Sequence, residues 1–359
     1  GNTCFMNSAL QCCLNTPPLT AWLLAAASTA AANPRSATRG RMAAAAAALA
    51  SRMWGRPGAG GAERPSDVKS VVGRVASRFL GYDQQDAQEF LRFFLDALHE
   101  DSCRVRGKLP YRELDHPASA PDARVAADWW AYDAERSDSP IRDIFAGQLR
   151  SAVACSRCGH VSRAFDTCWE LGVPIPKAAQ VRARRAGPFA SAAAVGGACS
   201  LDECVAAFTA PEDLAKQGYR CPGCKAEACV KTTQVWRGPA VLVVVVKRFA
   251  YSAFRRAKIS VSVELPQALD LRPFCAKGAP ALRGRTDYSL WGVVNHSGSL
   301  HGGHYTADCR NADTGQWFCF NDSRVSTSRR PTGGASPYLL FYVRNDAAPG
   351  VGHRDGGRL

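Results

Sequence analysis

Two cysteine pairs with the same spacing place the strongest constraint on how this chain of 359 residues can fold. Cys155 and Cys158 form one pair, Cys221 and Cys224 form the other, and each pair has a neighbouring glycine or proline typical of a turn. Four thiolates match the tetrahedral coordination of Zn²⁺. The segment 159–220 between the pairs is far longer than the roughly 15–20 residues of a compact zinc site. A single zinc ion would therefore join two distant hairpins.

The sequence leaves the ligand set of this cluster open. Cys229 or His160 could replace one of the four ligands, and the thiols could also be unligated. Because four protein ligands leave no open coordination position, a zinc ion here would be structural. The chain has an odd number of cysteines, 15, and their paired spacing fits a reducing compartment better than a disulfide scaffold. We therefore expect a cytoplasmic or nuclear protein.

The periodicity of apolar residues divides the chain into a helical first part and a strand-rich last part. Helical spacing predicts a first helix that ends near Pro17, two alanine-rich helices within 21–50, and helices at 66–79, 83–100, 125–135 and 201–208. Alternation predicts a hairpin over 145–165 and strands at 228–236, 241–249, 259–265, 288–296, 304–311, 317–322 and 338–343. Short turns between most of these strands favour antiparallel pairing. The expected fold class is α+β.

Two segments lack this periodicity. The basic stretch 178–197 is rich in alanine and glycine and is predicted to be a disordered or variable insertion. The end of the chain, 345–359, is predicted to be a disordered polar tail. In contrast, the helix predicted over 83–100 begins with Asp86 and Glu89, whose charges suit the positive end of the helix dipole.

Cys4 lies at the start of the first predicted helix. Apolar residues follow it at helical spacing, and Asn2 or Thr3 could cap the helix. Unpaired backbone N–H groups in a first turn favour a thiolate, which is the nucleophile that a cysteine protease needs. The alternative is a buried structural cysteine, because free cysteines usually pack as small hydrophobic residues.

A candidate general base lies near the other end of the chain. His304 follows two glycines and begins the strand predicted over 304–311. The next predicted strand ends in Asn321 and Asp322, and either side chain can accept a hydrogen bond from an imidazole N–H. Because a short turn at 313–315 joins the two strands, the hairpin can bring one of these acceptors beside His304.

These residues lie in motifs that resemble those of the ubiquitin-specific proteases. Gly1–Ser8, with Gln11 and Cys12, resembles the cysteine box of that family, and Gly302–Tyr305 with Phe320–Ser323 resembles its histidine box. Residues 84–91, 247–249 and 338–342 and both cysteine pairs resemble further family motifs. The resemblance runs in order from residue 1 to about residue 342.

The resemblance implies a papain-like cysteine protease shaped as thumb, fingers and palm. It assigns 1–143 to a helical thumb, 144–235 to fingers that carry the zinc ion and the insertion 178–197, and 236–344 to a β-rich palm. It also implies hydrolysis of the bond after the C-terminal glycine of ubiquitin. Cys4 would form the acyl-enzyme, His304 would transfer protons, and Asn321 or Asp322 would orient His304.

The same resemblance implies roles for residues around the nucleophile. Asp86, Glu89, Gly303 and Tyr305 match positions expected to contact ubiquitin. The family usually carries an asparagine upstream of the cysteine box that helps to hold the oxyanion, and the printed sequence begins after that position. The backbone N–H of Cys4 and the side chain of Asn2 are the remaining candidates for this role.

Two other function classes remain as alternatives. The first is a catalytically weak module that binds ubiquitin. The second is a zinc-dependent nucleic-acid binder, suggested by the net charge of +14, although the arginines are spread along the chain rather than gathered in one stripe. No apolar run approaches the ~18 residues of a membrane span. The expected partners are therefore ubiquitin and ubiquitinated proteins, engaged by a monomeric catalytic domain away from membranes.

Overall fold

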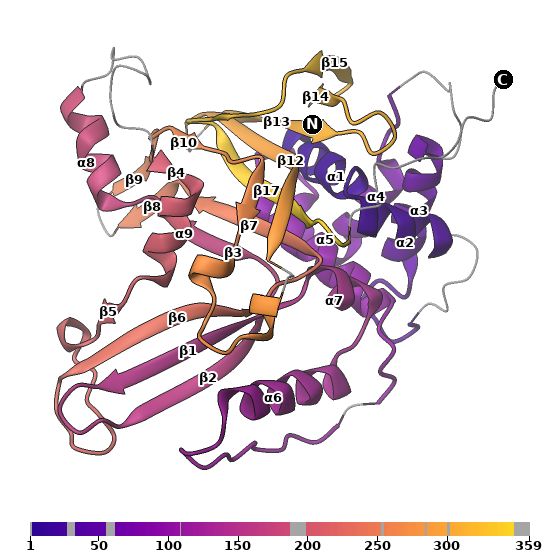
Figure 1. Ribbon diagram of the computed structural model, residues 1–359. Helices are drawn as coiled ribbons and strands as arrows, with labels where there is room; N and C mark the ends of the chain where they lie inside the picture. Colours follow the sequence, from indigo (N-terminus) through magenta and orange to yellow (C-terminus); the bar gives the residue numbers. More distant parts are fainter. Residues whose placement is uncertain are drawn as a thin grey trace.

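The computed structural model describes residues 2–26, 33–54, 62–107, 109–186, 199–252, 255–283, 286–299 and 302–347. Helices gather in the first half of the chain and strands in the second half (Figure 1). The helices are α1 (Cys4–Leu14), α2 (Pro17–Ala26), α3 (Arg41–Trp54), α4 (Ser66–Val75), α5 (Ala87–Asp101), α6 (Asp122–Arg136), α7 (Pro140–Phe145), α8 (Lys177–Ala186) and α9 (Leu201–Thr209).

Most strands belong to two sheets. The four-stranded sheet has the order β2 (Val161–Cys168), β1 (Gly147–Cys155), β6 (Cys229–Arg237) and β5 (Glu212–Asp213). The larger sheet has the order β15 (Arg324–Ser328), β14 (Trp317–Asn321), β13 (Gly303–Arg310), β12 (Asp287–Gly298), β17 (Pro337–Arg344), β7 (Val241–Lys247) and β3 (Leu171–Pro174), and β11 (Ala268–Asp270) also pairs with β12. In Figure 1, β1, β2 and β6 form a long ribbon that extends away from the larger sheet.

A small third sheet and a two-stranded ribbon complete the pattern. The third sheet contains β16 (Gly333–Gly334), β10 (Val263–Glu264) and β4 (Cys199–Ser200), and the ribbon pairs β8 (Phe249–Ser252) with β9 (Arg255–Lys258). Pairing is antiparallel as expected, except that β3 runs parallel to β7 and β4 runs parallel to β10. The fold is therefore α+β, with helices first and largely antiparallel sheets last.

The valine-rich strand β7 lies between two hydrophobic cores. Val243 and Val245 pack into the core that contains α1 and α5, whereas Val244 and Val246 pack into the core on the other face of the sheet. Since alternate side chains of a strand point to opposite faces, a strand buried on both faces must be apolar at every position. This arrangement explains the unbroken run of valines.

Helix α1 is buried on several sides at once. The Phe5 ring packs edge-on against Phe90 of α5, with ring centroids 5.7 Å apart. Cys12 packs against β13, where its Sγ atom lies 3.7 Å from Sγ of Cys309. The start of α1 is thereby fixed between the helical part and the larger sheet, as Figure 1 shows.

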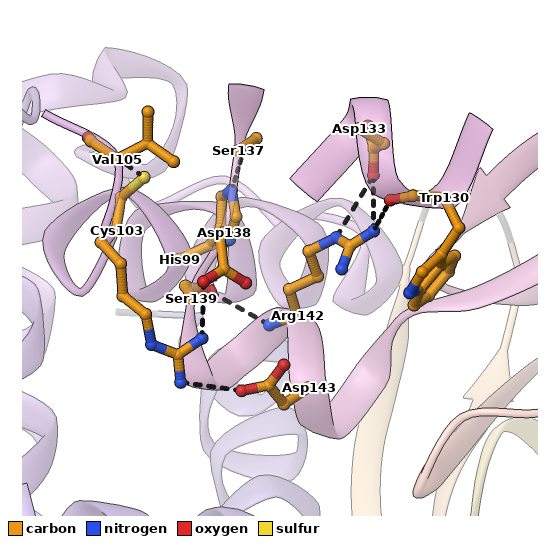
Figure 2. A network of polar contacts seen from close by, with 11 residues as sticks. His99, Cys103, Val105, Trp130, Asp133, Ser137, Asp138, Ser139, Arg142 and Asp143 are labelled. Atoms are coloured by element: carbon orange, nitrogen blue, oxygen red, sulfur yellow. Dashed lines mark hydrogen bonds and ion pairs between the residues drawn. The ribbon is translucent and has the colours of Figure 1, made fainter. Parts of the chain in front are cut away.

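Figure 2 shows the junction of α5, α6 and α7, which leads into β1. Nδ1 of His99 lies 2.6 Å from Oγ of Ser139, and the same hydroxyl oxygen caps α7 by accepting from the N–H of Arg142. The Arg142 guanidinium binds Asp133 at 3.2 Å and lies 4.0 Å from the centroid of the Trp130 ring. Burial lowers the pKa of His99 below its ordinary value, which favours the neutral ring. This network holds in place the segment that leads into β1, where the four-stranded sheet begins.

Several sequence predictions about element ends need correction. Asp83 to Asp86 are not helical, because α5 begins at Ala87 and Asp86 is its N-cap. Pro17 not only follows the first helix but begins α2, since proline is well tolerated in a first turn. The strand predicted over 259–265 is reduced to Val263–Glu264, and β15 was not predicted.

The predicted insertion 178–197 is also partly wrong. Its first residues belong to α8, a helix that their alanine content supports. Residues 187–197 of that insertion and residues 348–359 of the predicted tail lie outside the described residues. Trp129 packs on a core, whereas Trp130 lies between the guanidinium groups of Arg142 and Arg237. Within the described ranges, no helix has the length and apolar character needed to cross a membrane.

Candidate active site

Cys4 is the first residue of α1 and is 7% exposed. Thr3 occupies the N-cap position, but neither it nor Asn2 caps the helix through its side chain as predicted. The Oγ1 atom of Thr3 instead accepts a hydrogen bond of 3.3 Å from the Asn7 amide. The side chain at the N-cap therefore does not accept a hydrogen bond from the backbone N–H groups of the first turn. The thiol of Cys4 lies at this N-terminal end of the helix, which favours negative charge.

His304 lies beside Asn321 at one end of the hairpin formed by β13 and β14. Its Nε2 atom is 2.7 Å from Oδ1 of Asn321. The turn between the strands is held by Oδ1 of Asn311, which accepts from the backbone N–H groups of Asp313 and Thr314. Because Oδ1 only accepts hydrogen bonds, Nε2 carries the proton and Nδ1 of the neutral ring is left as the base.

Asp322 faces a different partner. Its Oδ1 atom accepts a hydrogen bond of 2.7 Å from the amide of Asn7, on α1. The backbone of Asp322 has φ of 51°, a left-handed conformation that aspartate adopts more readily than most residues. The turn after β14 thus sends Asn321 toward His304 and Asp322 toward the nucleophile helix.

Cys4 begins α1 and His304 lies on β13, and these two elements pack against each other. Neither of these two described residues forms a hydrogen bond to the other. Catalytic hydrogen bonds are often long in free enzymes and shorten when substrate binds. The Asn7–Asp322 bond and the contact between Cys12 and Cys309 hold the helix and the hairpin in register.

Asn2 is engaged elsewhere in this structure. Its amide nitrogen donates a hydrogen bond of 2.8 Å to the backbone oxygen of Tyr82. An oxyanion donor must point at the position of the developing charge. Asn2 would have to leave Tyr82 or use its second N–H for that role, so the backbone N–H of Cys4 is the simpler donor.

Gln84 binds both backbone groups of Gly303, the residue before His304. The Gly303 N–H donates to Oε1 of Gln84 at 2.8 Å, and Nε2 of Gln84 donates to the Gly303 oxygen at 2.5 Å. A Cβ atom at position 303 would lie 2.1 Å from Nε2 of His296, so only glycine fits there. Tyr305 is buried beside the same His296, with ring centroids 4.7 Å apart.

The two acidic residues at the start of α5 have different environments. Asp86 caps the helix, and its carboxylate also accepts from the hydroxyl of Tyr338 at 2.9 Å. Burial raises the pKa of Asp86 above its usual value, although these hydrogen bonds oppose the shift. Glu89 is exposed and lies 3.5 Å from a guanidinium nitrogen of Arg78. Of the two, Glu89 is the carboxylate available to a partner.

The four predicted cysteine ligands meet at the tip of the four-stranded sheet. The sulfur atoms of Cys155, Cys158, Cys221 and Cys224 all lie within 4.8 Å of one another. Cys155 and Cys224 are 3.7 Å apart, and Cys158 and Cys221 are 3.6 Å apart. A tetrahedral ion with Zn–S bonds of about 2.3 Å holds its sulfur ligands about 3.8 Å apart. This cluster therefore has the size and donor set to hold a metal ion.

Each cysteine pair lies in a tight turn of the same shape. The fourth residue after the first cysteine of each pair, Gly159 or Lys225, has positive φ and donates its N–H to that cysteine's oxygen. Backbone N–H groups, above all that of Cys158, lower the pKa of Cys155 to about 6. Cys229 lies opposite Cys155 in the β1–β6 ladder but does not belong to the cluster, and neither does His160.

Comparison with known proteins identifies the family. The sequence model described as "UCH: Ubiquitin carboxyl-terminal hydrolase" matches residues 1–342. The chain belongs to the ubiquitin carboxyl-terminal hydrolase family. It is 39% identical over 350 residues to ubiquitin carboxyl-terminal hydrolase 2 of Rattus norvegicus, covering 95% of this chain and 52% of that protein. It is 35% identical over 361 residues to human ubiquitin carboxyl-terminal hydrolase 21, covering 95% and 60%.

A solved structure supports the fold of this ubiquitin carboxyl-terminal hydrolase family member. A chain of the SAGA Ubp8/Sgf11/Sus1/Sgf73 DUB module bound to ubiquitin aldehyde superposes with a TM-score of 0.70 at 23% identity, covering 96% of this chain and 68% of that one. The chain spans only about half the length of the curated relatives that it matches first. The family and the fold are therefore established.

The structure also reveals residues of this family member that sequence reasoning did not single out. Gln84 contacts Gly303 across the chain, Asn7 contacts Asp322, and Arg248 is fully buried. Gln84 and Arg248 lie within the recognised motifs 84–91 and 247–249, and Asn7 lies within the cysteine box. Their positions within these motifs could have marked them as functional residues. Their contact partners can be identified only from the folded structure.

Proposed function

We propose that this chain is a thiol-dependent deubiquitinase that hydrolyses the bond after the C-terminal glycine of ubiquitin. The observation that carries the proposal is the hydrogen bond between His304 and Asn321 on a hairpin packed against the helix that begins with Cys4. Membership of the ubiquitin carboxyl-terminal hydrolase family supports the choice of substrate. The Ubp8 module with the same fold was bound to ubiquitin aldehyde, which also supports it.

In the proposed mechanism, Nδ1 of His304 accepts the proton of the Cys4 thiol. The thiolate attacks the carbonyl carbon of the terminal glycine, and the tetrahedral oxyanion accepts a hydrogen bond from the Cys4 backbone N–H. His304 then donates its proton to the leaving lysine amine, and the C–N bond breaks to give a thioester. Water, deprotonated by His304, hydrolyses the thioester and releases ubiquitin with a free carboxylate.

Asn321 is a positioning residue in this mechanism. Its Oδ1 atom fixes Nε2 as the protonated nitrogen, so that Nδ1 is left for the thiol. Glu89, Asp86, Gly303 and Tyr305 remain the proposed contacts to ubiquitin. Among them, Glu89 offers an exposed carboxylate, whereas Asp86 acts mainly through the cap of α5.

We further propose that the cysteine cluster holds one structural Zn²⁺ ion. The spacing of the sulfur atoms and the all-thiolate donor set support zinc over a hard cation, which prefers oxygen ligands. Cys155, Cys158, Cys221 and Cys224 would bind the ion and stabilise the tips of two hairpins. None of the fifteen cysteines forms a disulfide, which supports a reducing location, the cytoplasm or the nucleus.

Covalent labelling tests the proposed function. Ubiquitin with an electrophile at its C-terminus should form one adduct with the chain, located at Cys4 by peptide mapping. Cys4→Ser and His304→Ala should abolish the adduct, whereas Cys103→Ser should leave it in place, because Cys103 is a half-buried thiol beyond α5. An adduct at another cysteine, or one that persists in Cys4→Ser, would refute the site.

A further inference from the structure

A groove lies along the face of α1 that points away from α5. Its cavity has a volume of about 860 Å³. Thr3, Asn7, Leu10 and Leu14 line it at helical spacing, so they share one face of α1. Phe5, which packs on α5, lies two residues from Thr3 and therefore about 200° around the helix. The groove and α5 are thus on opposite sides of α1.

The groove reaches the chain neighbours of two candidate catalytic residues. Asn7 and Asp322, which join α1 to the turn after β14, line one wall with Phe320 and Val325 of β14 and β15. The other wall consists of Met53 at the end of α3 and of residues at and before the start of α4. A chain that lies in this groove would therefore contact Thr3, the residue before Cys4, and Asp322, the residue after Asn321.

The groove and the proposed ubiquitin contacts lie on different sides of α1, as expected if ubiquitin and the modified protein bind on opposite sides of the active site. The proposed contacts to ubiquitin, Glu89 and Asp86, lie at the start of α5, and α5 packs through Phe90 on the Phe5 face of α1, opposite the groove. The groove consequently faces the group that leaves when the thioester forms. Its volume is close to the upper end of the ~300–1,000 Å³ typical of ligand pockets and can hold several side chains.

The charges on the groove favour an acidic occupant. Arg52 is neutralised by Glu63 at 3.0 Å, and Asp322 binds the Asn7 amide. Arg64 and Lys69 also line the groove, and among the described residues neither forms an ion pair. The charged lining, Arg52, Arg64 and Lys69 against Glu63 and Asp322, therefore carries one net positive charge, with Arg64 and Lys69 unpaired among the described residues. The apolar part of this surface includes Val325, which is 55% exposed.

We propose that this groove binds an acidic segment of the modified protein, next to the lysine that carries ubiquitin. The proposal rests on the proposed function, because it names the leaving side of the same active site. Arg64 and Lys69 contact the acidic side chains, and Val325 and Met53 pack against their neighbours. The groove selects among ubiquitinated proteins by the sequence around the modified lysine.

Three substrates test the proposal. The first is ubiquitin with a C-terminal dye and no peptide. The other two are ubiquitin joined by an isopeptide bond to a lysine peptide with acidic flanks or with basic flanks. For the unmodified chain at low ionic strength, we expect kcat/KM for the acidic conjugate to exceed that for the basic conjugate by roughly tenfold, since two exposed ion pairs contribute modestly. Raising the salt concentration should reduce the difference.

Charge reversal provides the decisive comparison. The quantity compared is the ratio of kcat/KM for the acidic conjugate to kcat/KM for the dye substrate. In Arg64→Glu/Lys69→Glu this ratio should be roughly tenfold lower than in the unmodified chain. The ratio of the neutral variant Arg64→Gln/Lys69→Gln should lie between those two values. The matched control, Arg182→Glu/Lys277→Glu, reverses two exposed charges on α8 and near residue 277 and should keep the original ratio.

The outcomes separate the two proposals. An unchanged ratio in Arg64→Glu/Lys69→Glu, or an equal change in the control, would overturn the groove proposal and leave the proposed function standing. Failure of the unmodified chain to hydrolyse the dye substrate would overturn both. A circular dichroism melt of each variant shows that it is folded before its ratio is compared.

Discussion

Nε2 of His304 lies 2.7 Å from Oδ1 of Asn321, whereas the next residue, Asp322, accepts a hydrogen bond of the same length from Asn7. The sequence left Asn321 and Asp322 as equal candidates for the group that orients His304. The left-handed backbone of Asp322 turns its side chain toward α1. In this structure the two adjacent residues therefore hold different parts of the site, the base and the nucleophile helix.

Replacing Asn321 should impair catalysis more than replacing Asp322. Asn321→Ala removes the acceptor that fixes the tautomer of His304, and we expect kcat for a ubiquitin dye substrate to fall roughly 10- to 100-fold, part of the 10²–10⁴ that acid–base catalysis contributes. Asp322→Asn retains an acceptor and tolerates positive φ, so it should lower kcat only a few-fold. The opposite order would mean that Asp322 orients His304 during turnover.

The double hydrogen bond of Gln84 should support the position of His304. Gln84→Ala leaves both backbone groups of Gly303 without this partner. At about 0.5–1.5 kcal/mol per hydrogen bond, we expect kcat/KM to fall roughly tenfold. Gln85→Ala is the matched control, because no side-chain hydrogen bond is described for Gln85. Equal losses in the two variants would contradict a specific role for Gln84.

The cysteine cluster should contain one zinc ion per chain. Elemental analysis of the purified protein measures it, and Cys221→Ser should lose the metal and lower the melting temperature, because a structural site contributes directly to folding. Cys103→Ser should change neither quantity. A chain without stoichiometric metal that also resists chelators without loss of stability would refute the site.

His296 should make the protein less stable at acidic pH. Burial, together with the nearby Lys258, lowers the pKa of His296 to about 4. Since its unfolded pKa is ~6.5, the unfolded state binds more protons between these values. The contribution of the neutral ring to stability is thus complete above pH ~6.5 and is lost as the pH falls toward 4. Urea unfolding at several pH values measures this slope.

The variant His296→Gln distinguishes the effect of His296 on acid stability from that of other groups whose pKa is also lowered. His296→Gln cannot take up this proton, so its free energy of unfolding should depend less on pH between about 4 and 6.5 than that of the unmodified chain. His99, whose pKa burial also lowers, is retained in both proteins and contributes equally. Identical slopes would show that His296 does not titrate in this window.

Arg248 should resist even conservative replacement. Its guanidinium is fully buried and donates to four backbone oxygens, those of Ile259, Val261, Gly334 and Pro337. Burial lowers its pKa to about 10, so it still carries its charge at neutral pH. Lysine cannot reach four acceptors with one nitrogen, and Arg248→Lys should destabilise the fold by about 2–4 kcal/mol in urea unfolding. A change below about 0.5 kcal/mol would contradict this account.

Local patterns were sufficient to predict much of this fold. Alternation and helical spacing located α1, α5, β7 and β13 to within a few residues, because burial of one face imposes a period on the sequence. The predictions were wrong where the spacing of apolar residues does not distinguish one structure from another. The residues 83–86 look helical in composition but form the approach to the Asp86 cap, and β15 has no buried face that would mark it.

The candidate site was divided in the same way. The sequence by itself determined the residue types, since a cysteine at a helix start, a histidine after two glycines and two Cys-x-x-Cys turns each carry local chemistry. Which side chain accepts from His304, which residue binds Gly303, and whether four sulfur atoms meet were decided only by the tertiary structure. Most of these contacts join residues that are far apart in the chain, and Asn321 and Asp322 are neighbours that could each have accepted from His304. The geometry of these contacts depends on how α1, the start of α5 and the sheets pack together.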